Sequence, residues 1–197
     1  MTVPSFPSPA TTPPPAAEIP PRHPAAPAPG ELIPSHYHRC FGCGVDHGTG
    51  LHLSTTAGEG IDVLARFEVT VHHQGAPGLA HGGVLATAFD EAMSALNWLI
   101  YRPAVTGRLE IDFRRPVPVG SQLHVRAHVA GVAGRKTYTR ADGFLDAPDG
   151  PIAVRAAAVF IAVPMEHFAN NGRREDIDHA QTRTEVMDTT VQFEVNP

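Results

Sequence analysis

The sequence predicts an α+β domain built from one long buried helix and about five antiparallel strands. Residues 82–101 place apolar side chains at spacings of three and four, with no proline and with no glycine after position 83, which is the pattern of a helix. The other faces of this segment are also largely apolar, so we expect the helix to be buried on nearly all sides. The stripe consists of Leu85, Phe89, Ala92, Leu96 and Leu99, and the other faces carry Val84, Ala88, Met93, Ala95, Trp98 and Ile100.

Five segments around the helix have the composition and alternation of strands. One precedes the helix and four follow it, and glycine or proline turns separate them. They cover residues 61–69, 109–113, 122–132, 136–145 and 152–163. The clearest alternation lies in 122–132, where Leu123, Val125, Ala127 and Val129 share one face. A central part of about 130 residues is long enough for a single core.

The two ends of the chain differ from this central part in composition. Twelve of the 20 prolines precede position 35, in a tract rich in proline, alanine, serine and threonine. Such a tract buries too little apolar area to offset its ordering entropy, so we expect residues 1–34 to form a disordered or extended arm. Residues 169–197 are polar and acidic, with an alternation at 191–195 that indicates a short strand or a clasp on a partner. The domain is therefore expected to span residues 35–168.

The composition also excludes several classes of partner and location. No stretch approaches the roughly 18 consecutive apolar residues of a membrane span. The net charge of −5 leaves no basic surplus for nucleic acid. The proline-rich tract lacks the basic start and apolar run of a secretory signal, and it holds one arginine where a transit peptide would hold several. Two cysteines, expected to be reduced, favour a cytoplasmic protein.

His81, Gly82 and Gly83 form a sharp turn at the start of the buried helix, and Asp90 follows about two helical turns later. Backbone N–H groups at a helix start have no partner within the helix, so they offer a site for partial negative charge. Two interpretations stay open from the helix alone. The residues are either a tight turn with a satisfied carboxylate or an oxyanion hole with a general base.

The order of three motifs resembles a known family. The motifs are His81-Gly82-Gly83, the small or apolar run that leads to Asp90, and the segment VTGRLEIDFRRPVPVG at 105–120. Together they resemble the acyl-CoA thioesterases of the hotdog superfamily, in the branch with the phenylacetate-pathway and long-chain mitochondrial enzymes. The resemblance implies a hotdog fold, in which an antiparallel sheet of five to six strands wraps one long central helix. It also implies hydrolysis of acyl-CoA to a carboxylic acid and free CoA, without a cofactor, by a dimer or a dimer of dimers.

The resemblance further implies roles for individual residues. The N–H of Gly82 would polarise the thioester carbonyl, Gly83 would keep the turn open and His81 would brace it. Asp90 would activate water or attack the carbonyl directly, and Thr106 would help to place the water. Gly82 and Asp90 lie about 12 Å apart along the helix. One site would therefore use the glycine of one protomer and the carboxylate of another.

The CoA part of the substrate needs positive charge near the site, because it carries phosphates. The candidates are Arg114, Arg115, Arg135 and Lys136. Neighbouring residues on a strand point to opposite faces, so we expect one of Arg114 and Arg115 to face inward and the other outward. For each of them, a solvated surface position stays as open as a contact with CoA. Several relatives carry an asparagine or glutamine seven residues before the oxyanion glycine, where this chain has Gly75. Gln74 beside it is the expected substitute.

Cys40 and Cys43 form the only C-x-x-C motif, and four histidines surround it, namely His36, His38, His47 and His52. A structural zinc site needs four ligands, and neither a second cysteine pair nor a regularly spaced histidine pair is present. A redox dithiol would lie in a strand and helix pattern that this segment does not have. In the family that the chain resembles, a segment like Cys40 to Gly44, followed by Gly50-Leu51, lies against the sheet. We therefore expect a structural segment without a metal.

Two other functions stay open. A hydratase or dehydratase acting on acyl-CoA or acyl-carrier protein would carry a catalytic histidine with an acidic residue in a different motif. A non-catalytic ligand-binding or scaffold protein is the second alternative, and the proline-rich arm favours it because such an arm can dock a partner in extended form. Release of free thiol from a series of acyl-CoA substrates separates these functions.

Overall fold

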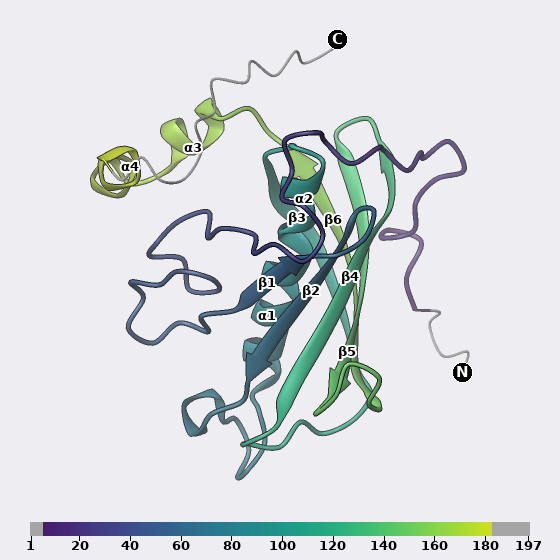
Figure 1. The fold of residues 1–197 in the computed structure, drawn as a ribbon, viewed down its shortest axis with the longest axis vertical. Helices are drawn as coiled ribbons and strands as arrows, with labels where there is room; N and C mark the ends of the chain where they lie inside the picture. Colours follow the sequence, from purple (N-terminus) through teal and green to yellow (C-terminus); the bar gives the residue numbers. More distant parts are fainter. Residues whose placement is uncertain (1–5, 183–197) are drawn as a thin grey trace.

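Six antiparallel strands form one sheet in the computed structural model, which describes residues 6–182 (Figure 1). The strands are β1 (Ser54–Ala57), β2 (Asp62–Glu68), β3 (Ala104–Phe113), β4 (Gln122–Ala133), β5 (Lys136–Leu145) and β6 (Ile152–Ala162). The helices are η1 (Val71–His73), α1 (Gly82–Ser94), α2 (Leu96–Leu99), α3 (Glu166–Asn171) and α4 (Arg174–Thr182). The order in the sheet is β1-β2-β4-β5-β6-β3, so β1 and β3 are the two edge strands.

Helix α1 packs across one face of the sheet, and its apolar stripe is buried there (Figure 1). Phe89 and Met93 are 0% exposed and share the core with strand residues such as Val63 and Leu123. Every second residue of β2 is buried, because side chains alternate between the two faces of a strand. The predicted α+β fold, an antiparallel sheet with one long helix packed against it, is confirmed.

The predicted helix 82–101 is divided into α1 and α2 at Ala95. The hydroxyl of Ser94 donates to the carbonyl oxygen of Glu91 at 2.9 Å, and a side-chain bond of this kind competes with the helical backbone bonds. The helical segment ends two residues earlier than predicted. Tyr101 has a φ of 50°, which lies outside the right-handed helical region.

The strands agree with the predicted segments in the centre of the sheet and differ at its edges. β5 has the predicted bounds, β4 and β6 differ from the prediction by one residue at one end, and β2 is one residue shorter at each end. β3 begins five residues earlier than predicted and contains a bulge between Thr106 and Arg108. The short strand β1 was not predicted, because its sequence STTA is too short and too polar to show a pattern.

Residues 6–34, from the segment predicted to be a disordered or extended arm, run as an irregular chain over the domain (Figure 1). Near the start of this segment, the N–H and hydroxyl of Ser8 and the hydroxyl of Thr11 all donate to the carboxylate of Glu110 on β3. An isolated bridge joins the segment to β4, and residues 31–33 hydrogen-bond along β1. The arm therefore contacts both edge strands of the sheet.

Replacement of Glu110 by glutamine is expected to release the start of the arm. Burial raises the pKa of Glu110, but hydrogen bonds from Ser8, Thr11 and Arg108 lower it more, to about 2. A depressed pKa stabilises the fold above the ordinary carboxyl pKa of about 4.3, and this contribution is lost as the pH falls toward 2. At neutral pH, limited proteolysis should cleave the arm faster in the variant than in the parent chain. Cleavage of the arm in the parent chain should become faster only when the pH is lowered into the acidic range.

Asp142→Asn is the matched control for this experiment, since Asp142 pairs with Arg155 at 3.2 Å and makes no hydrogen bond to the arm. Its cleavage should follow that of the parent chain. Equal rates of arm cleavage in Glu110→Gln and in the parent chain would contradict the anchoring role of the carboxylate.

After β6 the described chain forms α3, which begins three residues before the predicted polar tail 169–197, and α4, which lies within that region. The hydroxyl of Tyr37 donates to Asp176 of α4 at 3.2 Å, and Arg39 pairs with the same carboxylate at 3.6 Å. The predicted strand at 191–195 lies outside the described residues. Within the described residues, no helix has the length and apolar character needed to cross a membrane.

Candidate active site

The side chain of His81 holds the turn at the start of α1. His81 is the N-cap residue, with φ −70° and ψ 132°, and its Nδ1 accepts a hydrogen bond from the N–H of Gly83 at 2.9 Å. Its own N–H donates to the carbonyl oxygen of His73 at 2.7 Å. An N-cap side chain satisfies a helix N–H that has no partner within the helix. The ring of His81 is therefore engaged in the turn itself.

Gly82 presents its backbone N–H at the first position of α1. In the part of the chain that the structure describes, this N–H donates to no other group, and the amides at a helix start carry partial positive charge. The ring of Phe113 lies over the glycine, because a Cβ at this position would come 3.3 Å from its Cζ. Phe113 is 52% exposed. The turn thus offers one free amide beside an exposed aromatic ring.

Asp90, in the second half of α1, contacts Thr106 near the start of β3. Its Oδ1 accepts a hydrogen bond from the hydroxyl of Thr106 at 2.8 Å. Burial raises the pKa of Asp90, the hydrogen bond from Thr106 lowers it, and the negative charges of Glu91 and Cys40 raise it further. The net shift is upward, as for a carboxyl group removed from water. A carboxylate held in this way is suited to accept a proton.

One chain does not bring the glycine turn and the carboxylate together. Gly82 and Asp90 are eight residues apart on α1, which corresponds to about 12 Å. Thr106 contacts Asp90, whereas Phe113 contacts Gly82 from the other end of β3. Among the described residues, no strand pairs with the outer side of β3. The two groups therefore lie at separate places along an open edge of the sheet.

Gln74 holds the loop that precedes the glycine turn. Its Oε1 accepts a hydrogen bond from the N–H of Gly78 at 2.7 Å, and its backbone forms a bridge with Ala80. At the neighbouring Gly75, a Cβ would come 2.8 Å from the Cα of His81. A side chain at position 75 would therefore collide with the turn, which explains the glycine there. The oxygen of Gln74 is used within the loop.

The four basic candidates for CoA binding lie at two opposite ends of the sheet. They are Arg114, Arg115, Arg135 and Lys136. The first two follow the end of β3, whereas Arg135 lies in the turn between β4 and β5 and Lys136 is the first residue of β5. Arg135 donates from Nε to the carbonyl oxygen of Ala162 at 2.9 Å, and Ala162 pairs with Ala104 at the start of β3. Since β3 has ten residues, about 30 Å separates the two pairs within one chain.

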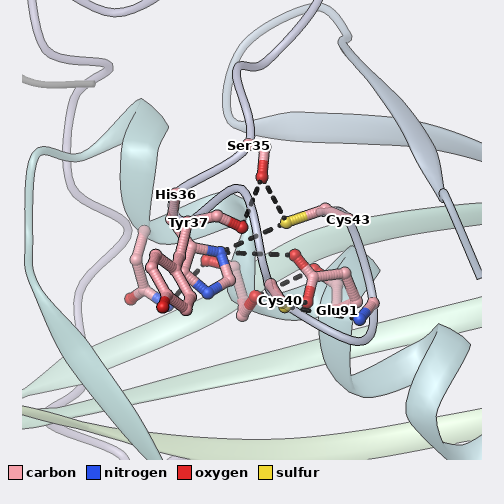
Figure 2. Close-up of polar contacts among 9 residues, drawn as sticks. Ser35, His36, Tyr37, Cys40, Cys43 and Glu91 are labelled. Atoms are coloured by element: carbon pink, nitrogen blue, oxygen red, sulfur yellow. Dashed lines mark hydrogen bonds and ion pairs between the residues drawn. The ribbon is translucent and has the colours of Figure 1, made fainter. Parts of the chain in front are cut away.

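Cys40 and Cys43 lie together with His36 beside Glu91 of α1 (Figure 2). The two sulfurs, a ring nitrogen and a carboxylate oxygen all lie within 4.8 Å of one another, so these four residues could hold a metal ion. We name them the Cys-His-Glu cluster. The sequence analysis missed Glu91, although a second acidic residue directly after Asp90 on a buried helix was a signal for it.

The cluster changes the ionisation of its members. A hydrogen bond with Cys43 is the largest cause that lowers the pKa of Cys40 to about 3, and the same interaction raises the pKa of Cys43. Burial lowers the pKa of His36, but interactions with Cys40 and Glu91 outweigh it and raise the pKa to about 10. The lowered pKa of Cys40 favours its thiolate, which is the form of cysteine that binds metals.

Residues 77–149 match the family model of the thioesterase superfamily. They contain the glycine turn, Asp90 and Thr106. This segment is similar to the thioesterase superfamily. The matched segment covers α1, α2, β3, β4 and β5. It begins after the two cysteines of the Cys-His-Glu cluster.

Curated proteins that are similar to this chain include acyl-coenzyme A thioesterases. Acyl-coenzyme A thioesterase THEM4 of Xenopus laevis is 28% identical over 99 residues, which are 50% of this chain and 44% of that protein. THEM4 of Bos taurus is 37% identical over 65 residues, or 33% of this chain and 26% of that protein. THEM5 of Mus musculus is 36% identical over 72 residues, or 36% and 29%. This chain thus spans less than half the length of these relatives.

Solved structures share the fold of this chain. A crystal structure of another thioesterase superfamily protein aligns with a TM-score of 0.59 and 25% identity, covering 70% of each chain. The protein smu.793 of Streptococcus mutans, in a crystal structure with acetyl CoA, aligns with a TM-score of 0.53 and 16% identity, covering 56% of this chain and 88% of that chain. The predicted hotdog fold is confirmed.

Proposed function

We propose that this chain hydrolyses acyl-CoA thioesters to a carboxylic acid and free CoA. The observation that carries the proposal is the 2.8 Å hydrogen bond from Thr106 to Asp90, within the residues that match the thioesterase superfamily. The relatives named as acyl-coenzyme A thioesterases support acyl-CoA as the class of substrate.

The proposed reaction uses the two oxygens of Asp90 differently. Thr106 holds Oδ1, so Oδ2 either takes a proton from the attacking water or attacks the carbonyl carbon itself. In the first case the oxygen of water bonds to the carbonyl carbon, the C–S bond breaks and the proton taken up by Asp90 passes to the departing CoA thiolate. In the second case the C–S bond breaks as Asp90 forms an anhydride with the acyl group, and a water then hydrolyses this anhydride, which releases the carboxylic acid and supplies the proton for the thiolate. The N–H of Gly82 donates to the carbonyl oxygen as it becomes negative. Gly83 and His81 keep the turn in shape for that bond.

A second copy of the chain completes the proposed site. Antiparallel pairing of two β3 edge strands about a two-fold axis would place the start of one strand beside the end of the other. Asp90 lies by the start of β3, at Thr106, and Gly82 lies by its end, at Phe113. The pairing therefore brings the carboxylate of one copy toward the glycine turn of the other. A dimer, alone or within a dimer of dimers, is the proposed functional unit.

The same pairing gathers the basic candidates for CoA binding. Arg115 at the end of one β3 would lie toward Arg135 and Lys136 by the start of the other, although they are far apart within one chain. Together they would supply the positive charge that the CoA phosphates need. Gln74 would support this part of the site through the loop that it holds.

Release of free thiol from acyl-CoA tests the proposed function. The full chain is incubated with acyl-CoAs from acetyl- to stearoyl-CoA and with an arylacetyl-CoA, and we expect turnover of about 1 s⁻¹ or more with at least one of them. Binding of CoA with no thiol release from any substrate would instead support the non-catalytic alternative. Hydration of an enoyl-CoA without thiol release would support a hydratase.

A further inference from the structure

We propose that the Cys-His-Glu cluster is a structural zinc site that fixes the cysteine loop, residues 35–53, to the central helix. Three ligands come from this loop, namely Cys40, Cys43 and His36, and the fourth is a carboxylate oxygen of Glu91 on α1 (Figure 2). The ion would join two parts of the molecule that are far apart in the sequence. This role is separate from the hydrolysis proposed above.

The spacing of the ligand atoms agrees with tetrahedral coordination. Zinc binds sulfur at about 2.3 Å and nitrogen or oxygen at about 2.0–2.2 Å, so the edges of such a tetrahedron measure roughly 3.3–3.8 Å. Cys43 Sγ lies 3.4 Å from His36 Nδ1, and His36 Nδ1 lies 3.5 Å from Glu91 Oε1. Cys40 Sγ lies 3.4 Å from Glu91 Oε2. The two edges that meet at His36 Nδ1 therefore already have the length that a bound ion requires, and Cys40 lies at a similar distance from the other oxygen of the same carboxylate.

The cysteine loop is folded tightly around the sulfur of Cys40. The N–H of Gly42 donates to this sulfur at 3.3 Å, and the N–H of Gly44 donates to the carbonyl oxygen of Cys40 at 2.9 Å. A Cβ at Gly42 would come 2.3 Å from Oε2 of Glu91, and one at Gly44 would come 2.4 Å from the carbonyl oxygen of His38. Gly42 thus lets the loop close over the carboxylate, and Gly44 lets the loop fold back against its own backbone. Hydrogen bonds of this kind orient metal ligands.

The donor set selects zinc among the common ions. Thiolate and imidazole ligands suit zinc, whereas calcium and magnesium prefer oxygen ligands. Four protein ligands leave no open position for water or substrate, so the site is structural and not catalytic. The hydroxyl of Ser35 lies 3.1 Å from the sulfur of Cys43 and adds an outer hydrogen bond.

A cavity beside the cluster gives an ion a path to its ligands. The cavity has a volume of about 300 Å³ and is lined by His36, Cys43 and Glu91, together with apolar residues such as Trp98. The sequence alone predicted no metal because a second pair of ligands was missing. The fold supplies that pair from the loop and from the helix.

The first test is the metal content of the full chain, purified without an affinity tag and under reducing conditions. Elemental analysis should find about one zinc per chain. After the zinc is replaced by cobalt(II), we expect thiolate-to-metal absorption in the near ultraviolet and the visible bands of four-coordinate cobalt. Cys40→Ser should remove most of the near-ultraviolet absorption. Glu91→Gln should keep it but weaken cobalt binding by at least about 10-fold.

Thermal stability gives a second readout. An ion that binds only the folded chain stabilises it, so removal of zinc with a strong chelator should lower Tm by roughly 5–10 °C relative to the zinc-saturated chain. His128→Gln on β4 and Glu166→Gln in α3 are matched controls outside the cluster. Both should keep the zinc content, the cobalt spectrum and the dependence of Tm on zinc.

A reduced wild-type chain that contains no zinc and gives no thiolate-to-cobalt absorption would overturn the proposal. Full zinc content in Cys40→Ser would also overturn it. The wild-type measurements stand even where a variant fails to fold. Because all of these readouts are independent of thioester hydrolysis, failure of the zinc site and failure of the proposed activity can be distinguished.

Discussion

Replacement of Asp90 by asparagine is expected to lower kcat for acyl-CoA hydrolysis by about 1,000-fold. Asparagine has nearly the same shape as aspartate, but it neither accepts the proton of water nor attacks a carbonyl carbon. Its side-chain oxygen can still accept the hydrogen bond that Thr106 donates to Oδ1, so the packing of α1 and the dimer should be retained. Thiol release at saturating substrate measures kcat, and circular dichroism with size-exclusion chromatography checks the fold and the assembly.

Two further variants show whether this loss belongs to the carboxylate. Thr106→Ala removes the hydroxyl that holds Asp90 but leaves the charge, so we expect a smaller loss of about 10- to 100-fold. Asp142→Asn changes a carboxylate that pairs with Arg155 and should leave kcat near that of the parent chain. Near-normal turnover in Asp90→Asn would assign Asp90 a structural role and end the proposed mechanism.

Replacement of Gly82 by proline is expected to lower kcat/KM by about 100-fold or more. Proline removes the N–H that would stabilise the oxyanion, and it is tolerated at the first position of a helix. The preceding residue, His81, already has a ψ of 132°, which is the extended backbone that precedes proline. The loss should therefore occur in a folded chain, as measured by thiol release with circular dichroism as a check.

Gly82→Ala is the matched control, because alanine keeps the N–H and adds a Cβ next to the ring of Phe113, as proline does. Gly82→Ala should keep most of the activity, and an activity as low as that of Gly82→Pro would assign the loss to crowding at Phe113.

Mixed dimers of Asp90→Asn and Gly82→Pro chains test the shared site. They should regain up to one working site per dimer, and verified mixed dimers without any recovery would show that the two groups do not act across an interface.

The helix and the central strands could be predicted because their apolar periodicity is a local property of the sequence. The strand β1 and the path of the arm could not. β1 is defined by its pairing with β2 and not by its own pattern. The arm is anchored where Ser8 binds Glu110, which lies 102 residues further along the chain. Contacts of this kind leave no periodic signal in either segment.

The candidate site shows the same division. The contact between Asp90 and Thr106 is consistent with the roles that the family resemblance implied, since both residues belong to its motifs. The part played by Glu91 could not be predicted from spacing, because the ligand set closes between a loop and a helix. A search for metal ligands at regular spacing along the sequence finds only ligands that lie in one segment, and Glu91 lies outside the segment with the cysteines.

The two edges of the sheet are not equivalent. Residues 31–33 hydrogen-bond along β1, so the backbone groups on that side are already occupied. β3 keeps an open row of such groups among the described residues. A sheet that can recruit a new strand on one side alone stops growing after two copies have joined, whereas two open sides would permit an endless ribbon. In the proposed dimer, the proline-rich arm would therefore keep the sheet from extending beyond two copies.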